Sequence, residues 1–213
     1  MLSKRNLFRI KFAVAIFAVF TVALVGYGFY RAERKDILAT LYLDTTVLSD
    51  TIKQSFRLHM LEGKREKTQN LLVTMSRLAS IERIRVYDRE GEIRFSTVEG
   101  EMGSRGDLSD PTCMICHEKG PSVRNVTVDY TTSEGMTVLR NVNPLESDPS
   151  CRRCHPDDEA LLGVLMVDFS TSSAERVLED LRWATFFLLV SITLVFGILV
   201  FLNQVFDWFR AGP

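Results

Sequence analysis

The chain has 213 residues, 46% of them apolar, and a formal net charge of −1 at pH 7. This length and apolar content suit one modest folded domain together with membrane spans. The near-neutral charge argues against nucleic-acid binding, because lysine and arginine are concentrated only in a short N-terminal cluster. We therefore expect no nucleic acid among the partners of this protein.

An apolar run of 19 residues, Phe12 to Tyr30, follows the basic segment 1–11. At about 1.5 Å per residue, a helix of this length nearly crosses a hydrocarbon core of about 30 Å. A cleaved signal peptide also starts with basic residues, but its apolar region is only about 7–15 residues long. This run ends in aromatic residues followed by Arg31, so we predict an uncleaved transmembrane helix over 12–30.

A second apolar run, Ala184 to Leu202, is bracketed by Trp183 and Trp208, residues that suit the two edges of a bilayer. It predicts a transmembrane helix over 183–206. Basic residues before the first span place the N-terminus in the cytoplasm, by the positive-inside rule. The predicted organisation is a cytoplasmic N-terminus (1–11), a periplasmic domain (31–182) and a short cytoplasmic tail (207–213), in the bacterial cytoplasmic (inner) membrane.

The exported segment opens with a predicted amphipathic helix. Its apolar residues recur at three, four or seven positions: Leu41, Leu48, Ile52, Phe56 and then His59 or Met60. Gly63 interrupts this pattern, and a further helical piece carries Leu71, Leu72, Met75 and Leu78. Such a stripe is typical of an ordinary core or of a helix-dimer seam, and the second alternative would join two chains in a homodimer through the long helix.

From Ile81 the pattern changes to the alternation of β-strands. Ile84 and Val86, then Ile93 and Phe95, flank an Asp88–Gly91 turn and predict a hairpin. Three more strands are expected around Val126–Tyr130, Met136–Val138 and Gly163–Phe169, and the serine-rich segment Ser170–Ser173 is expected to cap a helix through Ala174 to Arg182. The predicted fold class is α+β, with an antiparallel sheet.

Two pentapeptides, Cys113–His117 and Cys151–His155, hold all four cysteines and two of the three histidines. We expect both to lie in irregular connections, before and after the third and fourth strands. Cys-x-x-Cys-His is the covalent attachment site of a c-type haem. Two thiols at this spacing can add to the two vinyl groups of one porphyrin, while the adjacent imidazole becomes the proximal iron ligand. The sequence therefore predicts two covalent c-type haems, in agreement with an exported domain, because c-type haem is attached outside the bacterial cytoplasmic membrane.

Other uses of paired cysteines fit less well. Four-thiolate zinc sites usually separate their pairs by about 15–20 residues, whereas 34 residues, His117 to Ser150, lie between the pairs here. A zinc site or two local disulfides would not need a histidine after each pair, and a thioredoxin-like redox pair would be needed only once.

The haem cysteines are thus Cys113 and Cys116 for the first haem and Cys151 and Cys154 for the second, with axial ligands His117 and His155. The sixth ligand decides what the iron can do. Methionine or histidine there gives a six-coordinate iron for electron transfer or redox sensing, whereas an open position lets a small gas molecule bind. The candidates are His59, Met60, Met102, Met136 and Met166.

The order of elements, with the Gly163–Asp168 strand and a helix entering the second span, resembles the periplasmic PAS-like or Cache-like input domains of bacterial chemotaxis receptors and sensor histidine kinases. More narrowly, the chain resembles the subset that carries c-type haem. The resemblance implies a PAS-like sheet behind a long N-terminal helix. Such receptors continue into a HAMP segment and an output module, whereas this chain stops at Pro213. We expect a separate signalling output protein, a truncated gene, or recruitment to another role.

No catalytic constellation is offered, because two histidines are assigned to iron and His59 has no evident partner, so we do not expect an enzyme. Two functions remain. The domain is either a redox or haem-ligand sensor that biases a membrane-crossing element, or a dihaem electron carrier. A carrier would pass single electrons between a membrane quinol-oxidising complex and periplasmic cytochromes.

Overall fold

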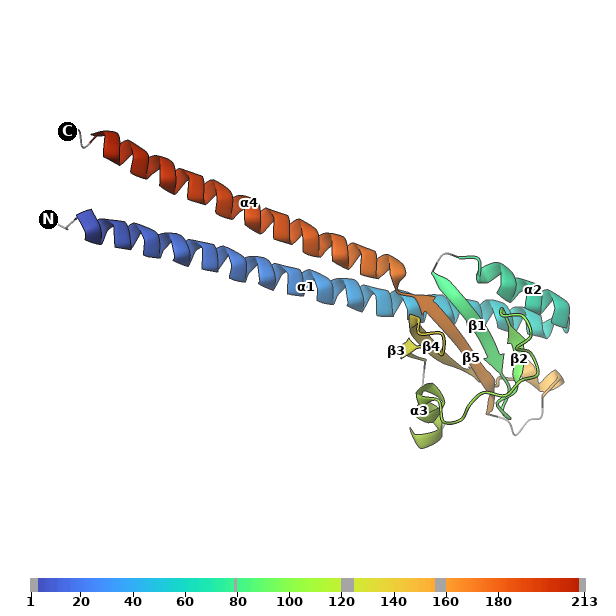
Figure 1. The fold of residues 1–213 in the computed structure, drawn as a ribbon. Coiled ribbons are helices and arrows are strands. Elements are labelled where there is room, and N and C mark those ends of the chain that lie inside the picture. Colours follow the sequence, from blue (N-terminus) through green and yellow to red (C-terminus); the bar gives the residue numbers. More distant parts are fainter. Residues whose placement is uncertain (1–3, 79, 120–124, 156–159, 211–213) are drawn as a thin grey trace. The chain divides into compact units, whose positions relative to one another are not determined.

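The computed structural model describes residues 4–78, 80–119, 125–155 and 160–210. Two compact units make up the chain, one from Met1–Leu38 with Ala174–Pro213 and the other from Ala39–Ser173. The helices are α1 (Lys4–Leu61), α2 (Arg65–Met75), α3 (Pro111–Lys119), the short η1 (Cys151–Arg153) and α4 (Ser172–Arg210) (Figure 1). The strands are β1 (Ile81–Tyr87), β2 (Ile93–Ser96), β3 (Val126–Thr131), β4 (Thr137–Glu146) and β5 (Leu161–Ser170).

The first unit consists of the apolar parts of α1 and α4, both long and apolar enough to cross a membrane. Their large side chains point outwards; Phe17 is 70% exposed and Phe187 is 62% exposed. A β-carbon added at Gly26 would lie 3.0 Å from Leu189 Cδ2, so this glycine permits a close approach of the two helices. Apolar surface of this kind suits lipid rather than water.

Helix α1 runs without a break from the first predicted span into the amphipathic segment. The sequence had suggested two consecutive elements, and the structure joins them into one helix. It ends at Leu61, two residues before Gly63, whose φ of 69° lies in the left-handed region that glycine adopts without strain. The amide of Gly63 donates to the carbonyl of Met60 at 3.0 Å, which closes the last turn.

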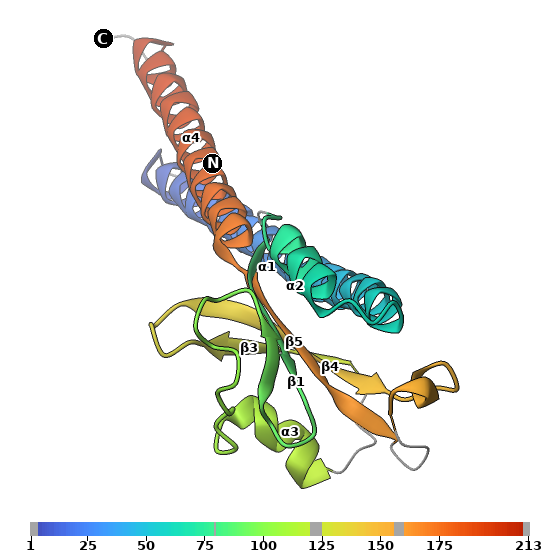
Figure 2. The ribbon, with the colours of Figure 1, turned by 90° about the vertical axis from the view of Figure 1, so that its right-hand side faces the viewer.

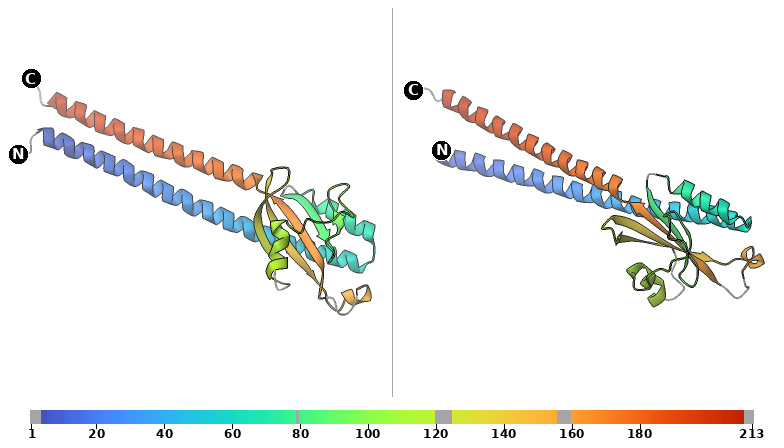
Figure 3. Two further views of the ribbon diagram at one scale, coloured as in Figure 1. Left: turned by 60° about the horizontal axis from the view of Figure 1, so that its bottom comes forward. Right: turned by 45° about the vertical axis from the view of Figure 1, so that its right-hand side comes forward.

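The second unit is built on a five-stranded antiparallel sheet in the order β2-β1-β5-β4-β3. Helices α1 and α2 cover one face of the sheet, and α3 lies on the other side (Figures 2 and 3). The five expected strands are confirmed, although β4 and β5 extend beyond their apolar cores. The hairpin turn is also confirmed, because the amide of Glu92 donates to Asp88 Oδ1 at 2.9 Å and Gly91 has a φ of 76°.

The hydrophobic core lies between the sheet and the two helices that cover it. Ile52 and Phe56 of α1 and Leu72 of α2 pack against the inward residues of β1 and β5, including Ile84 and Val167. The predicted helical stripe is therefore the core face of α1, as its spacing indicated. The same helix is also tied to β3 by polar contacts: Tyr42 Oη donates to Asp129 Oδ2 at 2.7 Å, and the hydroxyls of Thr46 and Thr127 lie 3.1 Å apart.

Truncation of the core face of α1 is expected to destabilise the second unit. Ile52→Ala removes a side chain that is 1% exposed and should lower the free energy of unfolding by about 2–5 kcal/mol, because lost apolar contact and a residual cavity add. The matched control is Thr51→Ala on the exposed side of the same helix, expected within about 0.5 kcal/mol of the parent. Pulse proteolysis of the full chain across a urea gradient measures both, and equal urea midpoints would contradict the packing described here.

Candidate functional site

The second cysteine motif forms a tight turn at the start of η1. The amide of Cys151 donates to the carbonyl of Asp148 at 2.9 Å, and the amides of Cys154 and His155 both donate to the carbonyl of Cys151, at 3.1 and 3.0 Å. The Asp148 carboxylate accepts from the amide of Ser150 at 2.7 Å and so fixes the residues that precede the motif. These bonds gather two thiols and an imidazole into a single turn of chain, as attachment to one porphyrin requires.

A large apolar cavity opens beside this turn. Its volume is about 760 Å³. Its apolar wall comes from α1, the sheet and the chain flanking the motif: Phe56, Met60, Leu61, Val86, Phe95, Leu145 and Leu162. Cys151, Cys154 and His155 all line it. Small-molecule sites in proteins range over about 300–1,000 Å³ and are lined mainly by apolar side chains. The residues therefore fit a covalently attached macrocycle at the second motif.

The first cysteine motif is helical, which corrects the expectation that both motifs lie in irregular connections. Asp110 precedes α3 as its cap: the carboxylate accepts from the amide of Thr112 at 2.8 Å, and the carbonyl accepts from the amide of Cys113 at 2.9 Å. Pro111 follows at the first helical position, where a missing N–H costs nothing. Asp110-Pro111-Thr112 is thus a helix start that can be recognised in the sequence, although no helix was predicted there.

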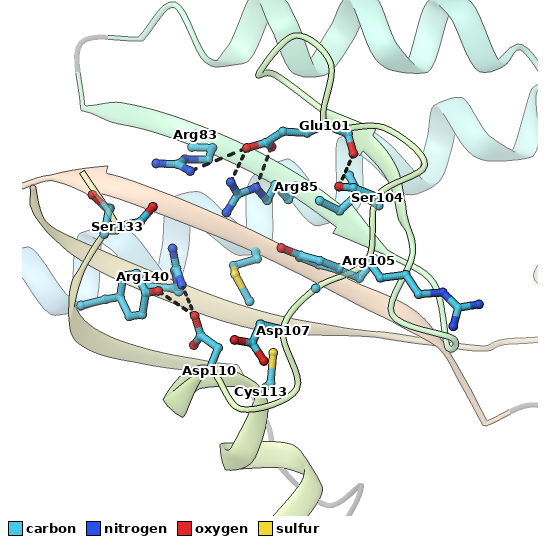
Figure 4. Close-up of a pocket in the computed structure, with 16 residues that line it drawn as sticks. Arg83, Arg85, Glu101, Ser104, Arg105, Asp107, Asp110, Cys113, Ser133 and Arg140 are labelled. Carbon is cyan, nitrogen blue, oxygen red and sulfur yellow. Dashed lines mark hydrogen bonds and ion pairs between the residues drawn. The ribbon is translucent and has the colours of Figure 1, made fainter. Parts of the chain in front are cut away.

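The first motif lies beside a smaller and more polar cavity, whose volume is about 220 Å³ (Figure 4). Cys113 lines this cavity, whereas His117 is exposed. The side chain of Cys116 is not among those that the structure describes. A cavity of this size and charge does not enclose a macrocycle, so a haem on this motif would have to lie outside it. The two motifs therefore have different surroundings.

Charged residues dominate the polar cavity. Three arginines come from the sheet face that α1 does not cover, and the other charged residues come from the chain between β2 and α3: Glu101, Arg105, Asp107 and Asp110. Arg83 and Arg85 alternate along β1 with the core residues Ile84 and Val86, so the pleat directs them to the opposite side. Arg85 makes two hydrogen bonds to the Glu101 carboxylate, one of them at 2.7 Å from Nε to Oε2. Figure 4 shows these groups across the cavity from Asp110 and Cys113.

A buried ion pair connects the α3 cap to the centre of the sheet. Arg140, 3% exposed, donates through Nε to Asp168 Oδ1 at 2.6 Å and through Nη2 to Asp168 Oδ2 at 2.9 Å. Its Nη1 lies 3.4 Å from Asp110 Oδ2, and Tyr130 Oη donates to the same oxygen at 2.6 Å. The guanidinium also lies over the Tyr130 ring, 3.3 Å from its centroid. Each charged group of this network therefore has a partner of opposite charge, which burial requires.

The network shifts the acidity of its carboxyl groups. Burial alone would raise the pKa of Asp110, but hydrogen bonds from Thr112 and Tyr130 outweigh it and hold that pKa below its ordinary value. Burial would likewise raise the pKa of Glu101, yet hydrogen bonds from Arg85 and Ser96 lower it. Both groups therefore stay ionised to lower pH in the folded chain than in the unfolded chain.

The candidate sixth ligands occupy different places. Met60 lines the apolar cavity with His155, and Met166 lines the polar cavity with Cys113. Met102 and Met136 are exposed and line neither cavity. His59 donates from Nδ1 to the carbonyl of Ser55 at 3.0 Å, which turns its ring back onto its own helix, and it lines neither cavity.

Within the described residues no cluster of three or more His, Cys, Asp or Glu side chains could hold a metal ion. The described cysteines are divided between two cavities, Cys113 in one and Cys151 and Cys154 in the other. The four-thiolate zinc alternative therefore finds no support in this part of the chain.

No protein-family model and no curated protein matches the sequence. The histidine kinase DctB sensor domain of V. cholerae matches the structure with a TM-score of 0.55 and 11% identity, over 74% of this chain and 59% of that one. The ligand-binding domain of the Campylobacter jejuni chemoreceptor Tlp3, in complex with 4-methylisoleucine, gives a TM-score of 0.44 and 15% identity, over 71% and 62%. The chain thus spans less than two thirds of either domain. The DctB likeness shows the fold: α+β, PAS-like, with a long N-terminal helix.

The lowered pKa values of Asp110 and Glu101 predict acid sensitivity. A carboxyl whose pKa is lower in the folded state contributes stability above its unfolded pKa, and this contribution is lost as pH falls through the folded pKa. Stability should therefore decline below about pH 4, the ordinary range of Asp and Glu. Asp110→Asn should be less stable than the parent at pH 7 but should lose less stability between pH 7 and pH 3. Urea midpoints by circular dichroism measure both, and an equal acid loss would contradict this assignment.

Proposed function

We propose that this protein is a membrane-anchored periplasmic dihaem c-type cytochrome that acts as a redox or haem-ligand sensor input module. The observation that carries the proposal is the apolar cavity at the second motif, which brings Cys151, Cys154 and His155 together beside a wall of apolar side chains. A haem bound there would supply an iron that exchanges one electron or binds a small ligand. The sensor-domain fold supports the input role.

The elements around the cavity suggest how its state reaches the membrane. Met60 and Phe56 belong to the last turns of α1, which is one helix from its apolar part onwards. On the other side, the second motif is followed by β5, and β5 leads into α4. Both helices that are long enough to span a membrane are therefore continuous in the chain with elements that line the cavity or directly follow it. A small change in packing there can bias a two-state membrane element.

We infer the orientation from the sequence: the basic cluster in 1–11 keeps the N-terminus in the cytoplasm, and the domain between the helices lies in the periplasm of a bacterial cytoplasmic membrane. A separate output protein, or an output module joined to the chain, would receive the signal. We further propose a homodimer through α1, since Leu43, Val47 and Leu58 are exposed on it outside the apolar span. Apolar side chains on one exposed helix suit a second copy of that helix.

An electron carrier is the second candidate function. One observation favours it: His117 and Cys154 are both exposed, so haems on the two motifs would have edges near solvent. Exposed edges suit transfer of single electrons to a periplasmic or membrane redox partner. An electron carrier needs no coupling between the state of the haem and α1. The two functions therefore differ in whether the last turn of α1 changes its packing when the haem changes state.

Covalent attachment of two haems is the first expected outcome. Pyridine haemochrome quantitation with intact mass should find two haem increments on the parent chain. The double variants Cys113→Ala/Cys116→Ala and Cys151→Ala/Cys154→Ala should each lose one increment and keep the other, because each pair serves one porphyrin. A chain that binds zinc and carries no haem would overturn the proposal.

Met60 is the sixth ligand that we infer for the second haem, because it lines the same cavity as His155 whereas His59 does not. Met60→Ala should abolish the low-spin spectrum of that haem, and His59→Ala should leave it unchanged. The comparison is matched, since the two residues are neighbours on α1. Unchanged spectra in both variants would exclude Met60 and His59 as the sixth ligand of the second haem and would remove the first step of the route to the membrane.

A further inference from the structure

The apolar cavity at the second motif carries a rim of basic side chains. Among the described residues, six cations line it: Lys53, Arg57, Lys64, Arg65, Arg94 and Arg153. The acidic residues of the lining in the same part of the chain are Glu62, Asp88 and Glu146. The described lining thus combines an apolar wall with more cations than carboxylates, and the cations Lys64 and Arg65 are exposed at its rim.

Three of these cations already have acidic partners. Arg57 forms an ion pair with Asp148. Lys53 Nζ lies 3.6 Å from Glu146 Oε2. The third, Arg94, lies 2.9 Å from Glu92 through Nη1 and 3.9 Å from Asp88 through Nε. Their charges are accounted for within the protein.

Lys64 and Arg65 differ from these three. Within the described part of the chain, neither forms an ion pair with a carboxylate. Arg65 donates through Nη2 to the backbone carbonyl of Arg94 at 3.2 Å, and its guanidinium lies 5.5 Å from the centroid of the Phe95 ring. These contacts hold the guanidinium at the cavity wall and occupy one of its five N–H donors. Both residues come from the corner between α1 and α2, away in sequence from the cysteine motif.

The chemistry of the haem identifies what two such cations would bind. The two vinyl groups, on adjacent pyrrole rings, are consumed by the thioethers to Cys151 and Cys154, and the two propionates project from the other pair of rings. Ionised carboxylates at the edge of an apolar cavity need charged hydrogen-bond donors, and a guanidinium matches a carboxylate with paired N–H groups. Arg153 lies between the two cysteines, on the thioether side. Lys64 and Arg65 are the cations contributed by a separate element.

We propose that Lys64 and Arg65 hold the propionates of the haem attached at Cys151 and Cys154. The proposal rests on the function given above and adds the orientation of the macrocycle: its thioether edge at η1 and its propionate edge at the corner between α1 and α2. The haem would then contact this part of the chain at two places, at Met60 on α1 and at the corner that connects α1 to α2. Positive charge at the propionates also favours the reduced iron, so these residues raise the reduction potential.

The test compares charge-removing and charge-keeping variants of the full chain. Lys64→Gln/Arg65→Gln should lower the reduction potential of the second haem by about 59 mV, equivalent to a tenfold change in its one-electron equilibrium constant. The propionate bending band in the resonance Raman spectrum should shift as well. Lys64→Arg/Arg65→Lys should keep the parent values, and Lys67→Gln, on α2 but outside the cavity lining, is the matched control.

The haem count separates the two possible failures. If the double glutamine variant retains two haems with the parent potential and the parent Raman band, the propionates lie elsewhere and this inference is wrong, while the haem proposal stands. If the parent chain carries no haem at Cys151 and Cys154, both are wrong. Should the double variant fold poorly, Lys64→Gln alone leaves the contacts of Arg65 in place and should still lower the potential, by less than the double change. An unchanged potential in that variant would count against Lys64.

Discussion

The alternation of side chains along β1 from Arg83 to Val86, and along the part of β5 that pairs with it, is the constraint on which the rest of the second unit depends. Ile84 pairs with Val167 on the face that α1 and α2 cover, whereas Arg85 pairs with Met166 on the opposite face. A shift of one residue in this register would move every apolar side chain into the charged cavity and every arginine into the core. The separation of an apolar site from a polar site therefore follows from the pleat of two strands.

Electrostatics then links the elements that the pleat separates. Arg140 lies in the sheet centre, and its partner Asp168 lies on β5, four residues before the start of α4. The same guanidinium reaches Asp110, the cap of the helix that carries the first cysteine motif. Loss of Asp168 would take from the buried Arg140 the carboxylate that accepts two of its hydrogen bonds, and such a loss costs more than a surface ion pair contributes. The cap of α3 is thus tied to the sheet by charge.

The two cysteine motifs have different settings as a result. The second motif faces apolar side chains from α1 and the sheet, and the described cavity is large enough for a macrocycle. The first motif lies on a capped helix beside a smaller cavity of about 220 Å³ that is lined by charged residues. In our proposal, the haem at Cys151 and Cys154 is the one whose chemistry is closest to α1. The haem at Cys113 and Cys116 would lie at the surface, near the charged side chains that line the polar cavity.

The sequence by itself located the two Cys-x-x-Cys-His motifs and determined most of the elements. Spacing alone was enough for the two motifs, the apolar runs and the five strands, because these signals are local: a cysteine pair with its histidine, a 19-residue run and an alternation each fit within one stretch of chain. The helical start at Asp110–Pro111 was equally local and was missed. Only the tertiary structure decided that Met60, and not its neighbour His59, lines a cavity with His155, since the choice depends on a helix and a turn about 95 residues apart in sequence. It also decided the partners of Arg140, because alternation predicts which face an arginine occupies but not which carboxylates the other strands bring to it.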